Sequence, residues 1–212
     1  MRKDSTNQIN TRDVGFSIGN TFVISKMKEK IRSNEHIALR EVVENFTDTK
    51  VYCPKQGVIE GGDIVLNNDK IYVGISQRTN MVGYEWLKRN YSDEFEIIPI
   101  YLNEGFLHLD VVFNIVSDKY ALVYKKGIKT ESMEKITSSF NVIFIDDDEQ
   151  MNLATNVFSI NENKIVIDKR NRKLSAELQK IGKEVIELEF DEITKIGGSF
   201  RCSTCPLIRG EK

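Results

Sequence analysis

The sequence predicts an α/β protein made of repeated units arranged around a common axis. A pair of short apolar segments around a polar turn recurs roughly every 45 residues. Between the recurrences the apolar period changes from two residues to about 3.6, as it does when strands give way to an amphipathic helix. No proline-rich linker, low-complexity run or charge block interrupts the series. We therefore expect a single domain over residues 1–212.

Each unit is expected to begin with a β-hairpin. The copies of the hairpin pattern are Asp13–Ile24, Gly62–Gly74, His108–Tyr124, Asn156–Ile167 and a shortened fifth copy, Gly198–Leu207. The turns Asn67–Asp69 and Asn161–Asn163 are rich in residues that tolerate left-handed backbone, which tight hairpins require. The flanking Ile, Val and Phe residues favour strands.

A helix is expected to follow each complete hairpin. The predicted helices are Lys28–Phe46, Thr79–Tyr91, Ser132–Phe140 and Asn171–Gly182. In the first of them, five residues fall toward one side at helical spacing, namely Ile31, Ile37, Ala38, Val42 and Phe46. The last three helices precede apolar segments that we predict to be buried strands, Phe95–Ile100, Val142–Ile145 and Val185–Leu188. The repeating unit is thus hairpin, helix, strand.

Composition excludes several classes of function. The chain is 40% hydrophobic with a formal net charge of -2, which predicts a mixed surface and no nucleic-acid partner. No apolar run approaches the roughly 18 residues of a membrane span, and the N-terminus lacks the hydrophobic region of a signal peptide. We expect a cytoplasmic protein without a membrane partner. Its three cysteines are too few for a disulfide framework, so reduced thiols are expected.

In a radial repeat the inner end of each hairpin points toward the common axis, so distant copies can contribute to one pocket. The residues at these ends are Asp13, Glu60, Asp63, His108, Asp110 and Cys202. Each alone has an ordinary explanation, such as a surface ion pair, a solvated turn or a core histidine. Together they indicate a site, because carboxylates are rarely buried without partners.

The cysteine-containing loop suggests thiol chemistry. Cys202 lies in a glycine-rich, cationic segment, and its histidine is distant in sequence, which is typical of a nucleophile in a spatially assembled site. We expect the glycine amides and Arg201 to favour the thiolate of Cys202.

Cys202 and Cys205 have the two-residue spacing of a zinc half-site or a redox pair. The chain has no second cysteine pair to complete a zinc site. Pro206 discourages the helix that a redox pair would normally open. Cys53 is most simply a packing residue.

These motifs resemble those of the guanidine-modifying enzymes, the arginine deiminase, dimethylargininase and amidinotransferase group. The matching segments are Thr11–Asp13, Glu60–Asp63, His108–Phe113 and Gly198–Leu207, in family order. The resemblance implies the pentein fold, a five-bladed α/β propeller. Relatives carry a helix and a strand before the counterpart of Thr11–Asp13, so we expect an incomplete N-terminal blade. The ring would then be open or covered by another subunit, as in a homodimer.

The resemblance also implies the roles of the site residues. Cys202 corresponds to the nucleophile, His108 to the general acid and base, and Glu60 to a carboxylate that binds the guanidinium and handles protons. Asp13 and Asp110 correspond to further guanidinium ligands, and Asp63 belongs to the same motif as Glu60. Arg32 and Arg78 lie where arginine deiminases place the arginines that hold the substrate carboxylate.

The implied activity is hydrolysis of a guanidino compound, such as arginine or a derivative, through an S-alkylthiouronium intermediate on Cys202. Ammonia or an alkylamine would leave, and a ureido product would be released. No metal or cofactor is expected, because the substrate brings its own positive charge. Dimethylargininases often carry a different residue in place of Asp110, so Asp110 favours a deiminase-like or amidinotransferase-like pocket. An amidinotransferase and a catalytically impaired guanidine-binding pseudoenzyme remain the alternatives.

Overall fold

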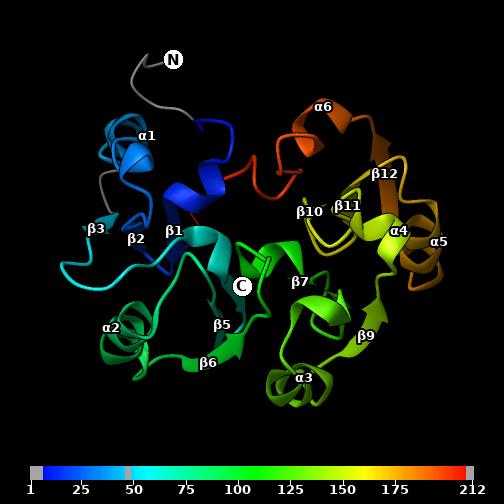
Figure 1. Ribbon diagram of the computed structural model, residues 1–212, viewed down its shortest axis with the longest axis horizontal. Coiled ribbons are helices and arrows are strands. Elements are labelled where there is room, and N and C mark those ends of the chain that lie inside the picture. The colour runs from blue at the N-terminus through cyan, green and yellow to red at the C-terminus, as the bar shows by residue number, and fades with distance from the viewer. Residues whose placement is uncertain (1–6, 46–48, 209–212) are drawn as a thin grey trace.

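Four three-stranded sheets follow one another around a centre, and their helices lie on the outside (Figure 1). The computed structural model describes residues 7–45 and 49–208. The predictions for Phe46 and for the N-terminal residues 1–6 fall outside these ranges. The α/β fold of repeated hairpin, helix and strand units is therefore confirmed for four units.

The first unit contains β1 (Gly15–Ile18), β2 (Thr21–Ile24), α1 (His36–Val43) and β3 (Lys50–Tyr52); the second contains β4 (Ile64–Asn67), β5 (Lys70–Ile75), α2 (Met81–Tyr91) and β6 (Glu96–Tyr101). The third contains β7 (Phe113–Ile115), β8 (Tyr120–Val123), α3 (Thr130–Thr137) and β9 (Asn141–Phe144); the fourth contains β10 (Phe158–Ser159), β11 (Lys164–Asp168), α5 (Arg172–Lys180) and β12 (Glu184–Leu188). The sequence did not predict β3 or the short helices α4 (Asp147–Gln150) and α6 (Asp191–Thr194).

All four sheets have the same topology. The first two strands form an antiparallel hairpin, and the third strand returns through the helix to pair in parallel with the second. A parallel partner requires such a crossover connection. The turn of the second unit has the expected left-handed residue, Asn68, with a φ of 53°. In the fourth unit Asn161 instead accepts hydrogen bonds through its side chain from the amides of Asn163 and Lys164, at 2.9 and 2.8 Å.

Short 3₁₀ turns precede the hairpins of the first three units, where the sequence suggested that strands begin. They are η1 (Thr11–Val14), η3 (Gly61–Asp63) and η4 (Leu109–Val111). They lie at the centre of the ring in Figure 1. These turns and the residues directly before them, and not the strands, carry five of the eight candidate site residues.

The predicted helix Lys28–Phe46 is broken in two. A 3₁₀ turn, η2 (Lys30–Arg32), is followed by the separate helix α1. Ile31 is 64% exposed and Val42 is 48% exposed, although both were predicted to face the core. Arg32, at 6% exposed, is buried instead and pairs with Asp13, and Glu35 and Val43 of this segment are buried as well. Burial of this ion pair therefore overrides the apolar pattern.

The hydrophobic core is divided into clusters that join neighbouring units. Tyr72 and Ile100 of the second unit pack with Phe113 of the third. Leu122 of the third unit packs with Ile165 and other residues of the fourth. The predicted outer strands are less buried than expected, since Phe144 and Leu188 are 55% and 47% exposed. Contacts between units thus hold the ring together.

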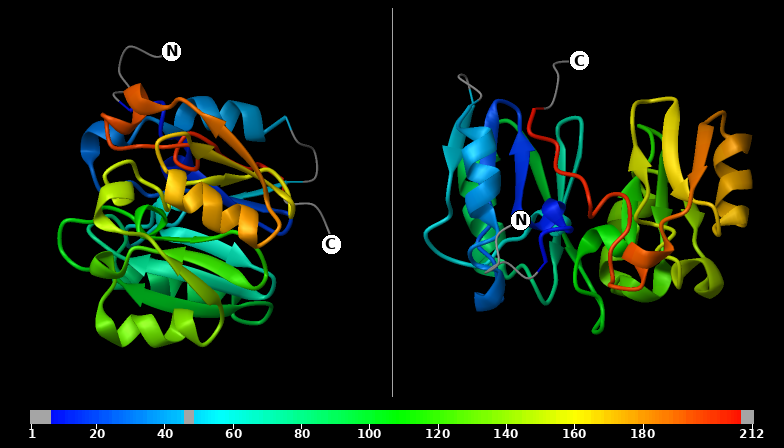
Figure 2. Two further views of the ribbon diagram at one scale, coloured as in Figure 1. Left: turned by 90° about the vertical axis from the view of Figure 1, so that its right-hand side faces the viewer. Right: turned by 90° about the horizontal axis from the view of Figure 1, so that it is seen from above.

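The predicted fifth hairpin, Gly198–Leu207, contains no strand, so the described residues do not form a five-bladed propeller. The segment runs between the first and fourth units in the right-hand view of Figure 2. Its backbone contacts each of them, because Arg12 N donates to Cys202 O at 3.0 Å and Arg201 N donates to Asn156 O at 3.2 Å. The N-terminal unit has all three strands, so the incomplete part of the ring is this fifth position.

Among residues 7–45 and 49–208, the helices are too short or too polar to cross a bilayer.

We expect Leu122→Ala to lower the free energy of unfolding by about 2–5 kcal/mol, because it leaves a cavity in the cluster between the third and fourth units. The matched change Leu188→Ala, at a half-exposed strand position, should cost about 0.5 kcal/mol or less. Urea denaturation of both variants measures the difference. Equal losses would show that the cluster between the units does not hold the ring together.

Candidate active site

A cavity of about 530 Å³ opens at the inner ends of the hairpins. Its polar lining includes Asp13, Arg32, Arg78, His108 and Cys202. Apolar residues complete the wall, among them Phe106, Leu107, Val111, Met151 and Ile196. We call this space the first cavity. The structure thus brings five of the eight predicted site residues to one place.

The 3₁₀ turns explain this convergence. Glu60 and His108 stand directly before η3 and η4, while Asp13 and Asp110 lie within η1 and η4. The turns must approach closely, and glycine permits this at position 62. A Cβ atom on Gly62 would lie 2.7 Å from His108 Cγ and 2.8 Å from Asp13 Oδ1.

His108 is surrounded by carboxylates. Its Nε2 lies 2.8 Å from Glu60 Oε2, and its Nδ1 lies 3.5 Å from Asp13 Oδ1. Burial opposes protonation, but the charge of Asp13 and the hydrogen bond to Glu60 raise the pKa of His108 to about 10. The same hydrogen bond holds the pKa of Glu60 below its usual value despite burial. At neutral pH His108 is therefore an imidazolium, able to donate protons.

Cys202 is buried and fixed through its backbone. Its amide donates to Asn156 Oδ1 at 3.0 Å, and its Sγ lies 3.9 Å from both carboxylate oxygens of Asp110. Burial and the charges of Asp110 and Asp13 raise the thiol pKa well above its ordinary value. The expectation that Arg201 favours the thiolate is therefore wrong for the ligand-free protein. Arg201 instead pairs with Asp110, Nε to Oδ2 at 3.4 Å.

The two predicted arginines differ in their surroundings. Arg32 donates from Nη1 to Asp13 and from Nε to Glu35, both at 2.9 Å. Burial opposes this charge, but Glu35 and Asp13 raise the pKa of Arg32. Arg78 has no carboxylate so close, since its Nη1 lies 3.8 Å from Glu60 and is buried without a hydrogen bond among the described residues. Arg78 is therefore better placed than Arg32 to bind an anionic group.

Asp63 lies behind the first cavity and not in its lining. Its carboxylate accepts hydrogen bonds from the amide of Leu109 at 2.8 Å and from the hydroxyl of Ser76 at 2.7 Å. Leu109 separates His108 from Asp110, so Asp63 fixes the turn that carries both. Asp63 therefore acts on the site through the hydrogen bond between its carboxylate and the amide of Leu109.

Asp110 also lies behind the lining, against Cys202 and Arg201. Burial raises its pKa, and the charge of Arg201 opposes that shift.

Sequence reasoning missed two asparagines. Asn10 precedes η1 as Glu60 precedes η3; it lines the first cavity, and its Oδ1 is buried without a hydrogen bond among the described residues. A Cβ atom on Gly198 would lie 2.4 Å from that oxygen. Asn156 holds the amide of Cys202 and stands at the start of the fourth hairpin copy. The repeat was the signal that could have revealed both residues, because each lies near the inner end of a hairpin copy, as the predicted site residues do.

The other two cysteines lie elsewhere. Cys53 is exposed, so its predicted packing role is wrong. Cys205 is half-buried, with its Sγ 3.4 Å from the carbonyl oxygen of Gly15. Neither lines the first cavity.

One group of described residues has the composition of a metal site. Ligand atoms of Asp13, Glu60 and His108 lie within 4.8 Å of one another. Arg32 Nη1, however, lies 2.9 Å from Asp13 and 3.9 Å from Glu60, and Arg78 is also close to Glu60. These guanidinium charges already balance the carboxylates and disfavour a divalent cation there.

We expect Asp63→Asn to change how stability depends on pH. Burial raises the pKa of Asp63 from 3.8 to about 7, so its contribution to the free energy of unfolding is fully present below pH 3.8 and is lost as the pH rises toward about 7. The asparagine cannot titrate, so the free energy of unfolding of the variant should rise relative to that of wild type as the pH increases over that interval. Urea denaturation across the interval measures this, with the exposed Asp69→Asn as the control. A constant difference would contradict a raised pKa.

The cysteines should react in an order set by burial and charge. Iodoacetamide at neutral pH is expected to modify Cys53 quickly and Cys202 slowly, because the Cys202 thiol is buried and protonated. Chloroacetamidine should favour Cys202, because its cation offsets the charges of Asp110 and Asp13. Peptide mass spectrometry over time gives both rates, and Cys53→Ser removes the fast site. Rapid modification of Cys202 by iodoacetamide would contradict the raised pKa.

Comparisons with known proteins agree with this arrangement. The family described as N,N dimethylarginine dimethylhydrolase, eukaryotic, matches residues 1–209. The uncharacterized protein YkgA of Bacillus subtilis is 39% identical over 213 residues, which cover the whole chain and 73% of that protein. An arginine deiminase of Bacillus cytotoxicus is 26% identical over 250 residues. That match covers 94% of this chain but only 61% of the deiminase.

Two solved structures share the fold. The N-terminal domain of ArgZ, an arginine dihydrolase from cyanobacteria, superposes with a TM-score of 0.89 at 23% identity over 98% of this chain and 78% of that domain. SxtG, an amidinotransferase from Microseira wollei, gives 0.83 at 22% identity, covering 92% of this chain and 68% of that one. Together with the family match, these findings confirm the resemblance seen in the motifs. The chain belongs to the N,N-dimethylarginine dimethylhydrolase family, within the guanidine-modifying pentein superfamily.

Proposed function

We propose that the protein hydrolyses a C–N bond of a guanidino compound through a covalent intermediate on Cys202. The observation that carries this proposal is that the Cys202 thiol and the His108 imidazolium line one small cavity, with the Asp110 carboxylate 3.9 Å behind the sulfur. A guanidinium resists attack because its charge is delocalised. An enzyme must hold it by its N–H groups and present a strong nucleophile to its face.

The carboxylates give the guanidinium a defined place. Both oxygens of Asp110 are 3.9 Å from Cys202 Sγ, so a guanidinium that donates two hydrogen bonds to Asp110 brings its carbon close to the sulfur. Asp13 Oδ1 is buried without a hydrogen bond among the described residues and can accept another N–H. These oxygens orient the substrate before reaction.

The substrate activates its own nucleophile. Burial and the negative charges of Asp110 and Asp13 raise the pKa of the Cys202 thiol and favour its protonated form. A bound guanidinium offsets both charges and lowers the thiol pKa. The proton leaves to solvent through the cavity, because His108 is already protonated. Thiolate therefore forms only when substrate is present.

His108 then serves both halves of the reaction. The thiolate adds to the guanidinium carbon and forms a C–S bond, and His108 donates its proton to the departing nitrogen as the C–N bond breaks. The neutral imidazole next takes a proton from water, whose oxygen attacks the same carbon. As the C–S bond breaks, the hydroxyl group of this adduct loses its proton to solvent, so a neutral ureido product and the thiolate are released. Glu60 keeps His108 oriented through the 2.8 Å hydrogen bond.

Arginine or a derivative is the substrate class that the rest of the cavity favours. Arg78 can bind a carboxylate, and the apolar wall formed by Phe106, Leu107 and Ile196 can pack against a methylene chain. The arginine deiminase relatives support an unsubstituted guanidine, as Asp110 does, while the family match supports a methylated one. Methyl groups remove donors that Asp110 would accept. We therefore place arginine ahead of dimethylarginine.

An amidinotransferase would share the first half-reaction. In the second half-reaction an amine would attack the carbon in place of water. The similarity to the SxtG structure concerns the fold and gives this alternative no further support.

The proposal predicts that the protein converts arginine, or less efficiently dimethylarginine or agmatine, to a ureido product. Cys202→Ser should lower kcat at least about 10⁴-fold, because it removes the nucleophile. Cys53→Ser is the matched control and should retain wild-type turnover. Ureido product and released amine are measured by mass spectrometry, with and without glycine as an amine acceptor.

Unchanged turnover in Cys202→Ser would overturn the mechanism. Arginine binding without any product would identify a non-catalytic guanidine-binding protein. Transfer of the amidino group to glycine would identify an amidinotransferase.

A further inference from the structure

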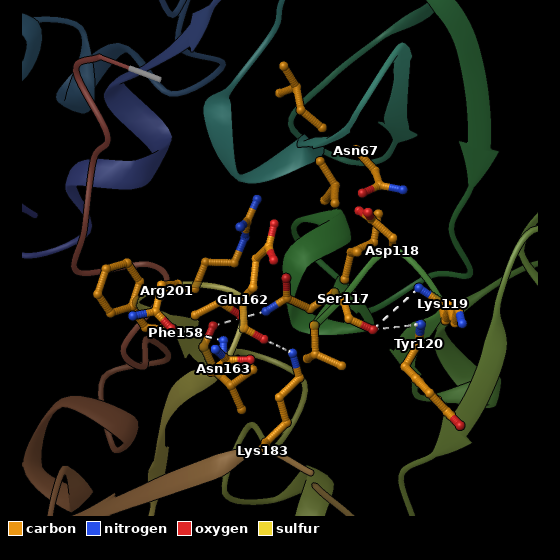
Figure 3. Close-up of a pocket in the computed structure, with 18 of the residues that line it drawn as sticks. Asn67, Ser117, Asp118, Lys119, Tyr120, Phe158, Glu162, Asn163, Lys183 and Arg201 are labelled. Carbon is orange, nitrogen blue, oxygen red and sulfur yellow. Dashed lines mark hydrogen bonds between the residues drawn. The ribbon is translucent and has the colours of Figure 1, made fainter. Parts of the chain in front are cut away.

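A second cavity, of about 810 Å³, lies at the opposite ends of the strands from the first. It is bordered by the turns between β4 and β5, β7 and β8, and β10 and β11, while the first cavity lies where these hairpins begin. Figure 3 shows the lining side chains, which come from these turns and from the loops that carry Lys183 and Arg201. The second cavity is separate from the proposed reaction centre and has no role in the chemistry described above.

Cationic side chains outnumber acidic ones in the second cavity. The cationic lining residues are Arg12, Lys119, Lys183 and Arg201, and the acidic lining residues are Asp118 and Glu162. Asp118 already accepts a hydrogen bond from Asn68, at 3.3 Å. The net charge of the lining is thus positive by two, which suits one small dianion better than a polymer such as nucleic acid.

Lys183 has the surroundings of an anion ligand. Its ammonium group donates to the carbonyl oxygen of Glu162, and no carboxylate lies within ion-pair distance of it among residues 7–45 and 49–208. It is half-buried, and burial lowers its pKa. An ammonium that is partly desolvated without a paired carboxylate gains most from an added negative charge.

Arg201 contacts groups near both cavities. Its side chain is 11% exposed and lines the second cavity, yet it directly precedes Cys202 and its Nε faces Asp110. Its Nη2 donates to the carbonyl oxygen of Ile64 at 3.0 Å, whereas Nε has no hydrogen bond within the described part of the chain. Arg201 therefore lines the second cavity and contacts Asp110, which lies behind Cys202 of the first cavity.

We propose that the second cavity binds a small oxyanion, a carboxylate or a phosphate, through Lys183 and Arg201, and that this binding is coupled to the first cavity. The coupling rests on the proposed function. A substrate guanidinium must take the Asp110 carboxylate that Arg201 now contacts at 3.4 Å. An oxyanion that holds Arg201 weakens this competition, so it tightens guanidinium binding. By linkage, the guanidinium tightens oxyanion binding by the same factor.

Calorimetry on the full chain tests the site. Inorganic phosphate and succinate are titrated separately at constant ionic strength, which distinguishes the two oxyanion sources. We expect at least one to bind with a Kd of about 1 mM or lower. Lys183→Gln should weaken that binding about tenfold, and Lys183→Arg should restore it. Lys164→Gln is the matched control, because Lys164 is an exposed lysine paired with Glu184 on the same sheet.

The outcomes separate the site from the proposed function. Absence of binding by either anion, or equal affinities in wild type and Lys183→Gln, overturns the oxyanion site. The coupling is measured as the affinity of Cys202→Ser for arginine with and without saturating anion, which requires no turnover. We expect that affinity to rise about fivefold or more, within the usual range of coupling between sites. An unchanged affinity overturns the coupling, whereas failure of catalysis alone concerns only the proposed function.

Discussion

The position of the Cys202 backbone between two units of the ring is the constraint on which the site depends. The fourth unit holds it through Asn156, whose side chain and carbonyl oxygen accept from the amides of Cys202 and Arg201. The first unit holds it through the amide of Arg12, which donates to Cys202 O at 3.0 Å. The segment contains no strand, and these hydrogen bonds to two units hold its backbone in place. The sulfur reaches Asp110 only because both attachments are made.

Burial and charge balance in the centre of the ring explain why the pKa of the Cys202 thiol is raised. The centre holds several carboxylates, and Arg32, Arg201 and protonated His108 offset them. Adding a thiolate would create one more buried negative charge, so the thiol stays protonated. On the proposed mechanism, a cationic substrate supplies the missing positive charge. The same imbalance would then govern both the choice of a guanidine and the reactivity of the thiol.

The sequence revealed the repeat and most of the site because both depend on local pattern. Hairpin copies at regular spacing place Asp13, Glu60 and His108 at the inner ends of their units. Selecting every polar residue at these inner ends would also have found Asn10 and Asn156. Other features depend on contacts that no local pattern encodes. Burial of Arg32 against Asp13 breaks the first predicted helix, and burial of Cys202 against Asp110 reverses the expected direction of its pKa shift. Asp63 faces the amide of Leu109 and the hydroxyl of Ser76 and not the cavity, although only two residues separate it from Glu60.

The ring architecture also explains how neighbouring residues can serve different cavities. In the third unit a 3₁₀ turn lies at the first cavity, and the strand that follows runs to a hairpin turn at the second. The fifth position lacks such strands, so its side chains are not committed to a sheet ladder. Arg201 is therefore free to extend toward the second cavity while its neighbour Cys202 faces the first. The contact between Arg201 and the Asp110 carboxylate therefore connects the second cavity with the residues behind the first.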